Sequence, residues 1–177
     1  MPRVEKLGSE EEAESQLRDA IASEEVQGFV SEGYTLSVTI AEIDDITPLE
    51  SHRDVVISAH ATVSDLWQHE TMVTLCQLCS GTWRGRGRAI YCWKYGDNKV
   101  MALDFSDDES QLGQWAERFI VRRTVEGTLH AEMVGTPTVS VGTAKSTEVS
   151  VEDMMSKAQA RVRLAKEQGK NQSVRYG

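Results

Sequence analysis

A predicted β-hairpin between Arg88 and Phe105 constrains the fold of this chain more than any other stretch. The run from Arg88 to Tyr95 is rich in aromatic and branched residues, which favour a half-buried strand. Gly96-Asp97-Asn98 follows as a turn, because glycine and asparagine tolerate positive φ. Lys99 to Phe105 then returns as a second apolar strand. This pattern predicts two antiparallel strands joined by a tight turn.

A helix is predicted directly after the hairpin. Ser106 is placed to cap it, with Glu109 three residues later to complete a capping box. The apolar residues that follow recur at helical spacing: Leu112, Trp115, Ala116 and Phe119. We therefore expect a hairpin that leads into an amphipathic helix.

The rest of the chain predicts helices and strands in mixed order. Tyr34–Ile43 alternates as a strand with one buried face, and Asp54–Val63 fits a strand or the start of a helix. Capped helices are expected after Ser9, Ser64 and Ser150, and paired strands at 120–124 and 128–134. The predicted fold class is α+β, a single domain with a small antiparallel sheet, packed helices and charged terminal segments. Four parts are expected: an acidic N-terminal segment at 1–32, an α+β core at 33–135, a linker at 136–149, and a basic amphipathic helix with a tail at 150–177.

Composition and charge narrow the class of protein. The 177 residues are 40% hydrophobic and 27% charged, with no apolar run near the roughly 20 residues of a membrane helix and no signal-peptide pattern. The chain has only three cysteines, which favours a reducing compartment. The net charge of −9 is uneven, since the first fifth is acidic and the chain from Lys157 onward is basic. An intracellular protein is expected.

Few residues suggest chemistry. Cys76 and Cys79 have the spacing of a zinc chelate, which His60, His69 or Cys92 would have to complete, so a zinc site stays open. Free cysteine is also a small core residue. No nucleophile motif is present, and acids after Ser106 fit a helix start. The expectation is a protein that is not an enzyme, with no catalytic residue, no metal and no cofactor.

The main positive feature is an arginine-glycine segment beside Trp83. Alternating glycines would let its guanidinium groups spread toward phosphates or lipid headgroups. The basic C-terminal helix offers a second cationic surface. The candidate residues for binding an anionic partner are Trp83, Arg84, Arg86, Arg88, Lys157, Arg161, Arg163 and Lys166.

The order of short motifs resembles rhabdovirus matrix proteins, of the plant cytorhabdovirus type. The resemblance is carried by the segment from Thr47 to Val55, by Trp67-Gln68-His69, and by Asp104 to Ser110 with Trp115 and Phe119. It implies a non-enzymatic structural protein that self-associates, condenses the nucleocapsid, and links it to the membrane and envelope glycoprotein during virion assembly and budding.

The resemblance also implies partners and a location. The partners would be further copies of the chain, the viral nucleoprotein and glycoprotein, a peripheral anionic membrane and RNA. The location would be the virion, the host cytoplasm and host membranes. The alternative hypothesis is a small RNA-binding or host-regulatory protein that acts through the Arg/Gly/aromatic loop.

Overall fold

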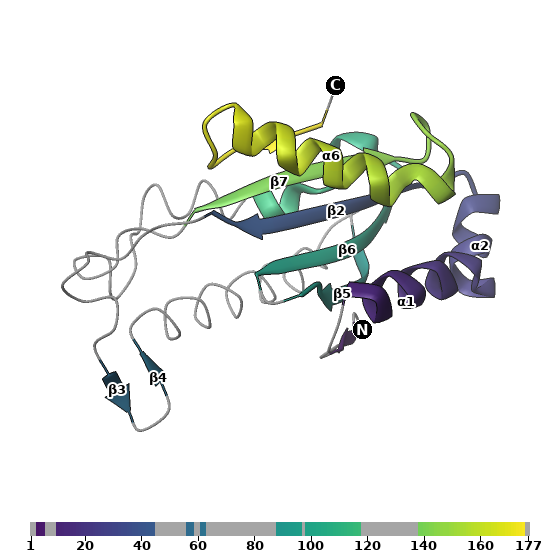
Figure 1. The fold of residues 1–177 in the computed structure, drawn as a ribbon. Coiled ribbons are helices and arrows are strands. Elements are labelled where there is room, and N and C mark those ends of the chain that lie inside the picture. Colours follow the sequence, from purple (N-terminus) through teal and green to yellow (C-terminus); the bar gives the residue numbers. More distant parts are fainter. Residues whose placement is uncertain are drawn as a thin grey trace.

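The protein folds around one mixed β-sheet with helices packed against it (Figure 1). The computed structural model describes residues 3–5, 10–44, 56–58, 61–62, 88–96, 98–117 and 138–175. Within these residues the main sheet has six strands in the order β1-β5-β6-β2-β7-β8, and β3 and β4 form a separate pair. The predicted α+β fold class is confirmed.

Strand β2 (Thr35–Ile43) lies at the centre of the sheet. It pairs antiparallel with β6 (Lys99–Ser106) on one side and with β7 (Val139–Lys145) on the other, so Thr39 lies opposite both Ala102 and Thr143. The long strands are thus antiparallel, as predicted.

The predicted hairpin is confirmed, and two short strands complete the sheet. Strand β5 (Arg88–Lys94) pairs antiparallel with β6, and Gly96 in the turn has φ +71°. Strands β1 (Arg3–Glu5) and β8 (Ser173–Val174) add in parallel at the edges, next to β5 and β7. The parallel edges make the sheet mixed and not purely antiparallel.

Three helices cover one face of the sheet: α1 (Glu10–Ala22), α2 (Glu24–Ser31) and α6 (Met154–Glu167). Their apolar side chains form one core with the even-numbered residues of β2 and with residues of β5, β6 and β7. Figure 1 shows α6 running along β7, and α1 beside β5. The helices after Ser9 and Ser150 are therefore confirmed, although the first breaks at Ser23, whose hydroxyl caps α2.

The opposite face of β2 is also buried, which corrects the prediction of a strand with one exposed face. Ser37 and Thr39 are buried there, and the hydroxyls of Thr39 and Thr143 lie 3.0 Å apart. The residues after β6 cover this face, since Leu112, Trp115 and Ala116 are fully buried. Alternation of polar and apolar residues indicated the pleat correctly, but serine and threonine can be buried when a second layer covers them.

The segment after β6 is less regular than the predicted capped helix. A 3₁₀ turn, η2 (Glu109–Gln111), forms first, and its cap is Asp108 and not Ser106. Gly113, with φ +78°, interrupts the chain before a further helical turn at 114–117. Gly113 belongs here because an added Cβ would lie 2.7 Å from the hydroxyl of Thr143.

Three segments expected to be irregular form strands. The predicted linker at 136–149 contains β7, a wholly buried strand, because its serine and threonine residues pack inside a two-layered structure. Residues 1–8 were expected to be unstructured, but residues 3–5 form β1, and residues of the expected C-terminal tail form β8.

Other predicted elements are only partly described. The region 54–63 contains the short strands β3 (Val56–Ser58) and β4 (Ala61–Thr62). The 3₁₀ turn η3 (Val151–Asp153) precedes α6, with Ser150 at its N-cap position. The predicted helix after Ser64, the strands at 120–124 and 128–134, and Phe119 lie outside the described residues.

Candidate functional site: a charged corner at the end of β2

Charged and polar residues gather where β2 ends, beside the turn between β5 and β6. We call this set, Glu42, Asp44, Asn98, Lys99 and Lys166, the β2 corner. The amide of Ile43 donates to the carbonyl of Asn98 at 2.9 Å, which holds the turn against the strand end. Lys99 lies directly opposite Glu42 in the sheet. The corner therefore joins three elements, because Lys166 comes from α6.

Asp44 organises the corner. Its carboxylate is 1% exposed and accepts hydrogen bonds from Thr138 Oγ1 at 2.7 Å, Ser140 Oγ at 2.5 Å and the amide of Asn171 at 3.0 Å. These donors come from the start of β7 and from the loop after α6, where Lys170 and Asn171 adopt positive φ. A buried carboxylate with several donors is well stabilised, so Asp44 fixes the end of α6 relative to β2.

The remaining charges of the corner form two ion pairs. Lys166 Nζ lies 2.8 Å from Glu42 Oε1, and both side chains are partly exposed, at 24% and 20%. Lys99 Nζ lies 3.0 Å from Glu10 Oε1, at the first turn of α1. Pairs that are partly open to solvent can exchange partners at small cost. The corner thus offers two lysines to an incoming anion.

Tyr95, at the end of β5 next to the turn, connects the helices that pack beside the corner. Its hydroxyl donates to Glu14 Oε1 at 2.6 Å and accepts from the side-chain amide of Gln159, so it links α1 to α6. Burial raises the pKa of Tyr95 well above its ordinary value, and the hydrogen bond to Glu14 adds to this. The phenol therefore keeps its proton and its role as a donor.

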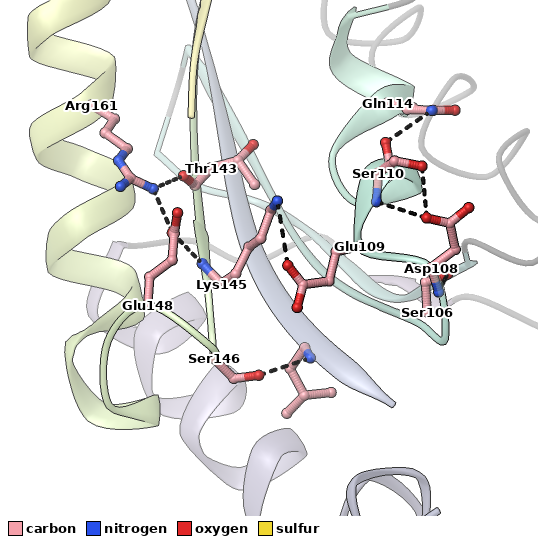
Figure 2. A network of polar contacts seen from close by, with 11 residues as sticks. Ser106, Asp108, Glu109, Ser110, Gln114, Thr143, Lys145, Ser146, Glu148 and Arg161 are labelled. Carbon is pink, nitrogen blue, oxygen red and sulfur yellow. Dashed lines mark hydrogen bonds and ion pairs between the residues drawn. The ribbon is translucent and has the colours of Figure 1, made fainter. Parts of the chain in front are cut away.

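A second polar network lies at the other end of β7 (Figure 2). Arg161 donates to the carbonyl of Thr143 at 2.5 Å and to Glu148 Oε2 at 2.9 Å, and Lys145 Nζ lies 3.9 Å from Glu109 Oε2. Burial alone would raise the pKa of Glu148, but the hydrogen bonds from Arg161 and from the Lys145 amide hold it below its ordinary value. Positive and negative charges balance here, so we interpret this network as structural.

The structure describes only some of the residues that the sequence nominated for anion binding. Trp83, Arg84 and Arg86 lie outside the described residues, and Arg88 is the first residue of β5. On α6, Arg163 is exposed and Lys157 half-buried, whereas Arg161 is 4% exposed and faces the sheet. Lys166 is the member of the nominated set that lies in the β2 corner. The set as a whole stays a prediction.

Of the three cysteines proposed as zinc ligands, the structure describes only Cys92. Cys92 is buried within β5, while Cys76 and Cys79 lie outside the described residues. Among the described residues, no three side chains of histidine, cysteine, aspartate or glutamate are grouped to hold a metal.

The sequence interpretation missed Glu42, Asp44 and Lys99. For Asp44 a usable signal was present, because an acid that directly follows a buried strand lies at a sheet end, where ligand sites of α/β folds often form. The sequence of the turn after β5 does not indicate that Lys99 lies beside Glu42 and Asp44, because this proximity depends on the pairing of β2 with β6.

Solved structures with the same fold include GGDEF domains. The GGDEF domain of PA1120 (YfiN or TpbB) from Pseudomonas aeruginosa matches with a TM-score of 0.66 at 12% identity, over 92% of this chain and 94% of that one. The GGDEF domain of DgcB from Caulobacter crescentus, solved with c-di-GMP, matches with a TM-score of 0.60 at 16% identity, over 96% and 91%.

A third match is the diguanylate cyclase SiaD of Pseudomonas aeruginosa, solved with its activator SiaC. It matches with a TM-score of 0.63 at 15% identity, over 96% of this chain and 59% of that one. No protein-family model and no curated protein sequence matches the chain. At these identities the likeness shows the fold alone.

These matches overturn the resemblance to rhabdovirus matrix proteins. The matched domains are described as GGDEF and diguanylate cyclase domains, so the expected role in virion assembly is wrong, and the RNA-binding alternative gains no support. The expectation of a protein that is not an enzyme is corrected too, because diguanylate cyclases are enzymes.

The expected partners change with the fold assignment. The solved neighbours hold c-di-GMP or the activator SiaC, in place of a viral nucleoprotein and glycoprotein. No helix in the described part of the chain is long and apolar enough to cross a membrane. The expected virion and host-membrane location is not shown by these observations.

Proposed function

We propose that this chain is a guanine-nucleotide-binding domain of the diguanylate cyclase type, and that the β2 corner holds the phosphates of the nucleotide. The observation that carries the proposal is the similarity of fold to GGDEF domains over nearly the whole chain, including one solved with c-di-GMP. GTP and c-di-GMP are the ligands to test.

The chemistry of the corner suits a phosphate. Lys166 is a half-buried ammonium group whose partner, Glu42, is a single carboxylate. A nucleotide phosphate carries more negative charge than a carboxylate, and charge-assisted hydrogen bonds to it are short and strong. A phosphate can therefore replace Glu42 as the partner of Lys166. Asp44 keeps α6 in the place where Lys166 reaches the corner.

Joining nucleotides is commonly assisted by divalent metal ions held by carboxylates. The described carboxylates of the corner do not fit such an ion on their own. Asp44 already accepts three hydrogen bonds, and Glu42 is paired with Lys166. We therefore derive no step through a metal, and the proposal concerns binding of the nucleotide.

The test is isothermal titration of the full-length protein with GTP and with c-di-GMP, alongside chromatography of a GTP reaction for c-di-GMP. We expect saturable binding of at least one of the two nucleotides. Replacing Lys166 by Met should weaken it by roughly tenfold or more, because a charged hydrogen bond is lost. Formation of c-di-GMP would extend the proposal to catalysis.

The matched control is Lys157→Met, on the same helix but outside the corner. It should bind as the unchanged protein does. Absence of binding to both nucleotides at millimolar concentration would overturn the proposal. Equal weakening by Lys157→Met and Lys166→Met would overturn the placement of the site at the corner.

A further inference from the structure

The ion pairs of the β2 corner are not the ones that the sheet itself would favour. Glu42 and Lys99 are direct neighbours on antiparallel strands, so their side chains leave the same face with Cβ atoms about 5 Å apart. Opposite charges at such positions attract each other. Here each has a helix residue as its partner instead: Lys166 from α6 binds Glu42, and Glu10 from α1 binds Lys99.

Helix α1 holds Glu10 in place over the turn. The carboxylate of Glu10 lies 3.2 Å from the point where a Cβ on Gly96 would be, so the absence of a side chain at Gly96 gives it room. Further along α1, Glu14 accepts from the Tyr95 hydroxyl at 2.6 Å, and Gln16 accepts from Trp93 Nε1 at 3.0 Å. Three polar residues of one helix thus contact the hairpin that carries Lys99.

The four charges can be paired in a second way. If Glu10 leaves the turn, Lys99 still has Glu42 directly opposite it on β2, and Glu42 is then shared between Lys99 and Lys166. Glu10, Glu42, Lys99 and Lys166 sum to zero charge with α1 docked. With Asp44 counted as well, the β2 corner and Glu10 together carry a formal charge of −1, and without Glu10 the corner is neutral. The change of one positive unit favours an anion.

We propose that Lys99 is a second phosphate-binding cation of the corner, and that Glu10 of α1 limits its use while the helix is docked. This inference rests on the proposed function, since it concerns the same site and the same ligands. A partner or a mutation that draws the start of α1 away from the hairpin would raise the affinity for the nucleotide. The position of α1 is then a control of binding that is built into the fold.

The experiment compares nucleotide affinities of four full-length proteins by isothermal titration with GTP and c-di-GMP in buffer of low ionic strength. They are the unchanged protein, Glu10→Gln, Glu11→Gln, and Glu10→Gln combined with Lys99→Met. Glu11 is the control, because it is an exposed neighbour on the same helix and its replacement removes the same charge. Thermal melts followed by circular dichroism confirm that each variant is folded.

We expect Glu10→Gln to tighten binding by roughly twofold to fivefold, the effect of one partly exposed ion pair. Glu11→Gln should change affinity much less, and the gain should vanish when Lys99 is Met. Equal gains in Glu10→Gln and Glu11→Gln, or a gain that persists without Lys99, would overturn the inference while leaving the proposed function intact. Failure of every protein to bind would overturn the proposed function itself.

Discussion

At the scale of single residues, Asp104 is the place where burial and charge conflict most. Its side chain accepts a hydrogen bond from the Gly113 amide at 2.9 Å, but its second oxygen has no hydrogen-bond partner among the described residues. Ser37 lies opposite it on β2, and within the same part of the chain the Ser37 hydroxyl also lacks a hydrogen-bond partner. Burial raises the pKa of Asp104 to about 7, although the bond from Gly113 opposes this. The carboxyl therefore keeps its proton in mildly acidic solution.

This raised pKa predicts a stability that falls as pH increases. In the unfolded chain Asp104 loses its proton near its ordinary pKa of 3.8, whereas in the folded protein it does so near 7. Between these values the folded state binds the extra proton, so the free energy of unfolding decreases with rising pH and levels off above about pH 7. The full effect is about 4 kcal/mol at most.

Replacing Asp104 by Asn should remove this slope, since the amide is neutral at every pH. Urea unfolding at intervals from pH 5 to pH 8 measures it. The Asn variant is expected to be more stable than the unchanged protein at pH 8, with the difference shrinking toward pH 5. Asp107→Asn, at an exposed position in the same segment, should keep the slope. A parallel pH dependence in Asp104→Asn would contradict this account.

At the scale of elements, α6 packs closely on β7. The backbone of Gly142 lies against the helix, and an added Cβ would be 2.1 Å from the carbonyl of Ala158 and 2.6 Å from the amide of Val162. The obstructing atoms are backbone, so they cannot turn aside as a flexible side chain would. Gly142 therefore sets the distance between helix and sheet.

Replacing Gly142 by Ala should destabilise the protein by at least about 2 kcal/mol, because the helix must shift outward. Gly28→Ala is the matched control: it lies in α2 with nothing near its Cβ position, and should stabilise by about 0.5–1 kcal/mol through helix propensity. Chemical denaturation of both variants measures the contrast. Similar stability changes for the two would show that α6 can move freely on β7.

Sequence patterns predicted the strands and helices that depend on local features such as turns, caps and residue spacing. The hairpin at Arg88 to Phe105 was predicted from its turn and its alternation, and the helices after Ser9 and Ser150 were predicted from N-cap residue types and apolar spacing. In the structure Ser150 makes no capping hydrogen bond to the backbone. Strand β7 was missed because its short polar residues fit a linker equally well. Its burial depends on β2, whose Thr39 contacts Thr143 across 104 residues of sequence.

The candidate site was predictable only in part, for the same reason. Lys166 stood out as a cation, but its partner Glu42 comes from a strand far away in sequence, brought near only by the sheet. Arg161 lies one turn before Ala165 on the helix face that meets β7, and periodicity alone did not assign it to that face. Positive charge identified candidate anion-binding residues, but tertiary contacts determined which of them lie at the site.

At the scale of the whole molecule, the strand order brings the two ends of the chain onto one sheet. The early strand β2 is central, and its second neighbour, β7, comes from the last quarter of the chain. Half of the hydrogen bonding of β2 therefore depends on residues beyond 138. Such long-range pairing makes cooperative folding depend on the C-terminal part.

A chain ending at residue 137 should therefore lack a cooperative thermal transition, because it loses β7, α6 and β8 together. A chain starting at residue 9 lacks only β1, an edge strand of three residues, and should still melt cooperatively with a modestly lower midpoint. Scanning calorimetry of both truncated chains checks this. A sharp transition in the first would mean that β2 folds stably without β7.

The short strands at the two edges of the sheet have a consequence for behaviour at high concentration. β1 and β8 are three and two residues long, so the edge strands themselves present few unpaired backbone groups to other molecules. Strand β8 pairs with β7 at Val141 and Gly142. Short edge strands are one way in which proteins avoid edge-to-edge aggregation. If β8 frays, β7 becomes the outer strand, and it carries a single charged residue, Lys145, in seven. Loss or unfolding of the C-terminal tail would then lead to aggregation of molecules that are otherwise folded.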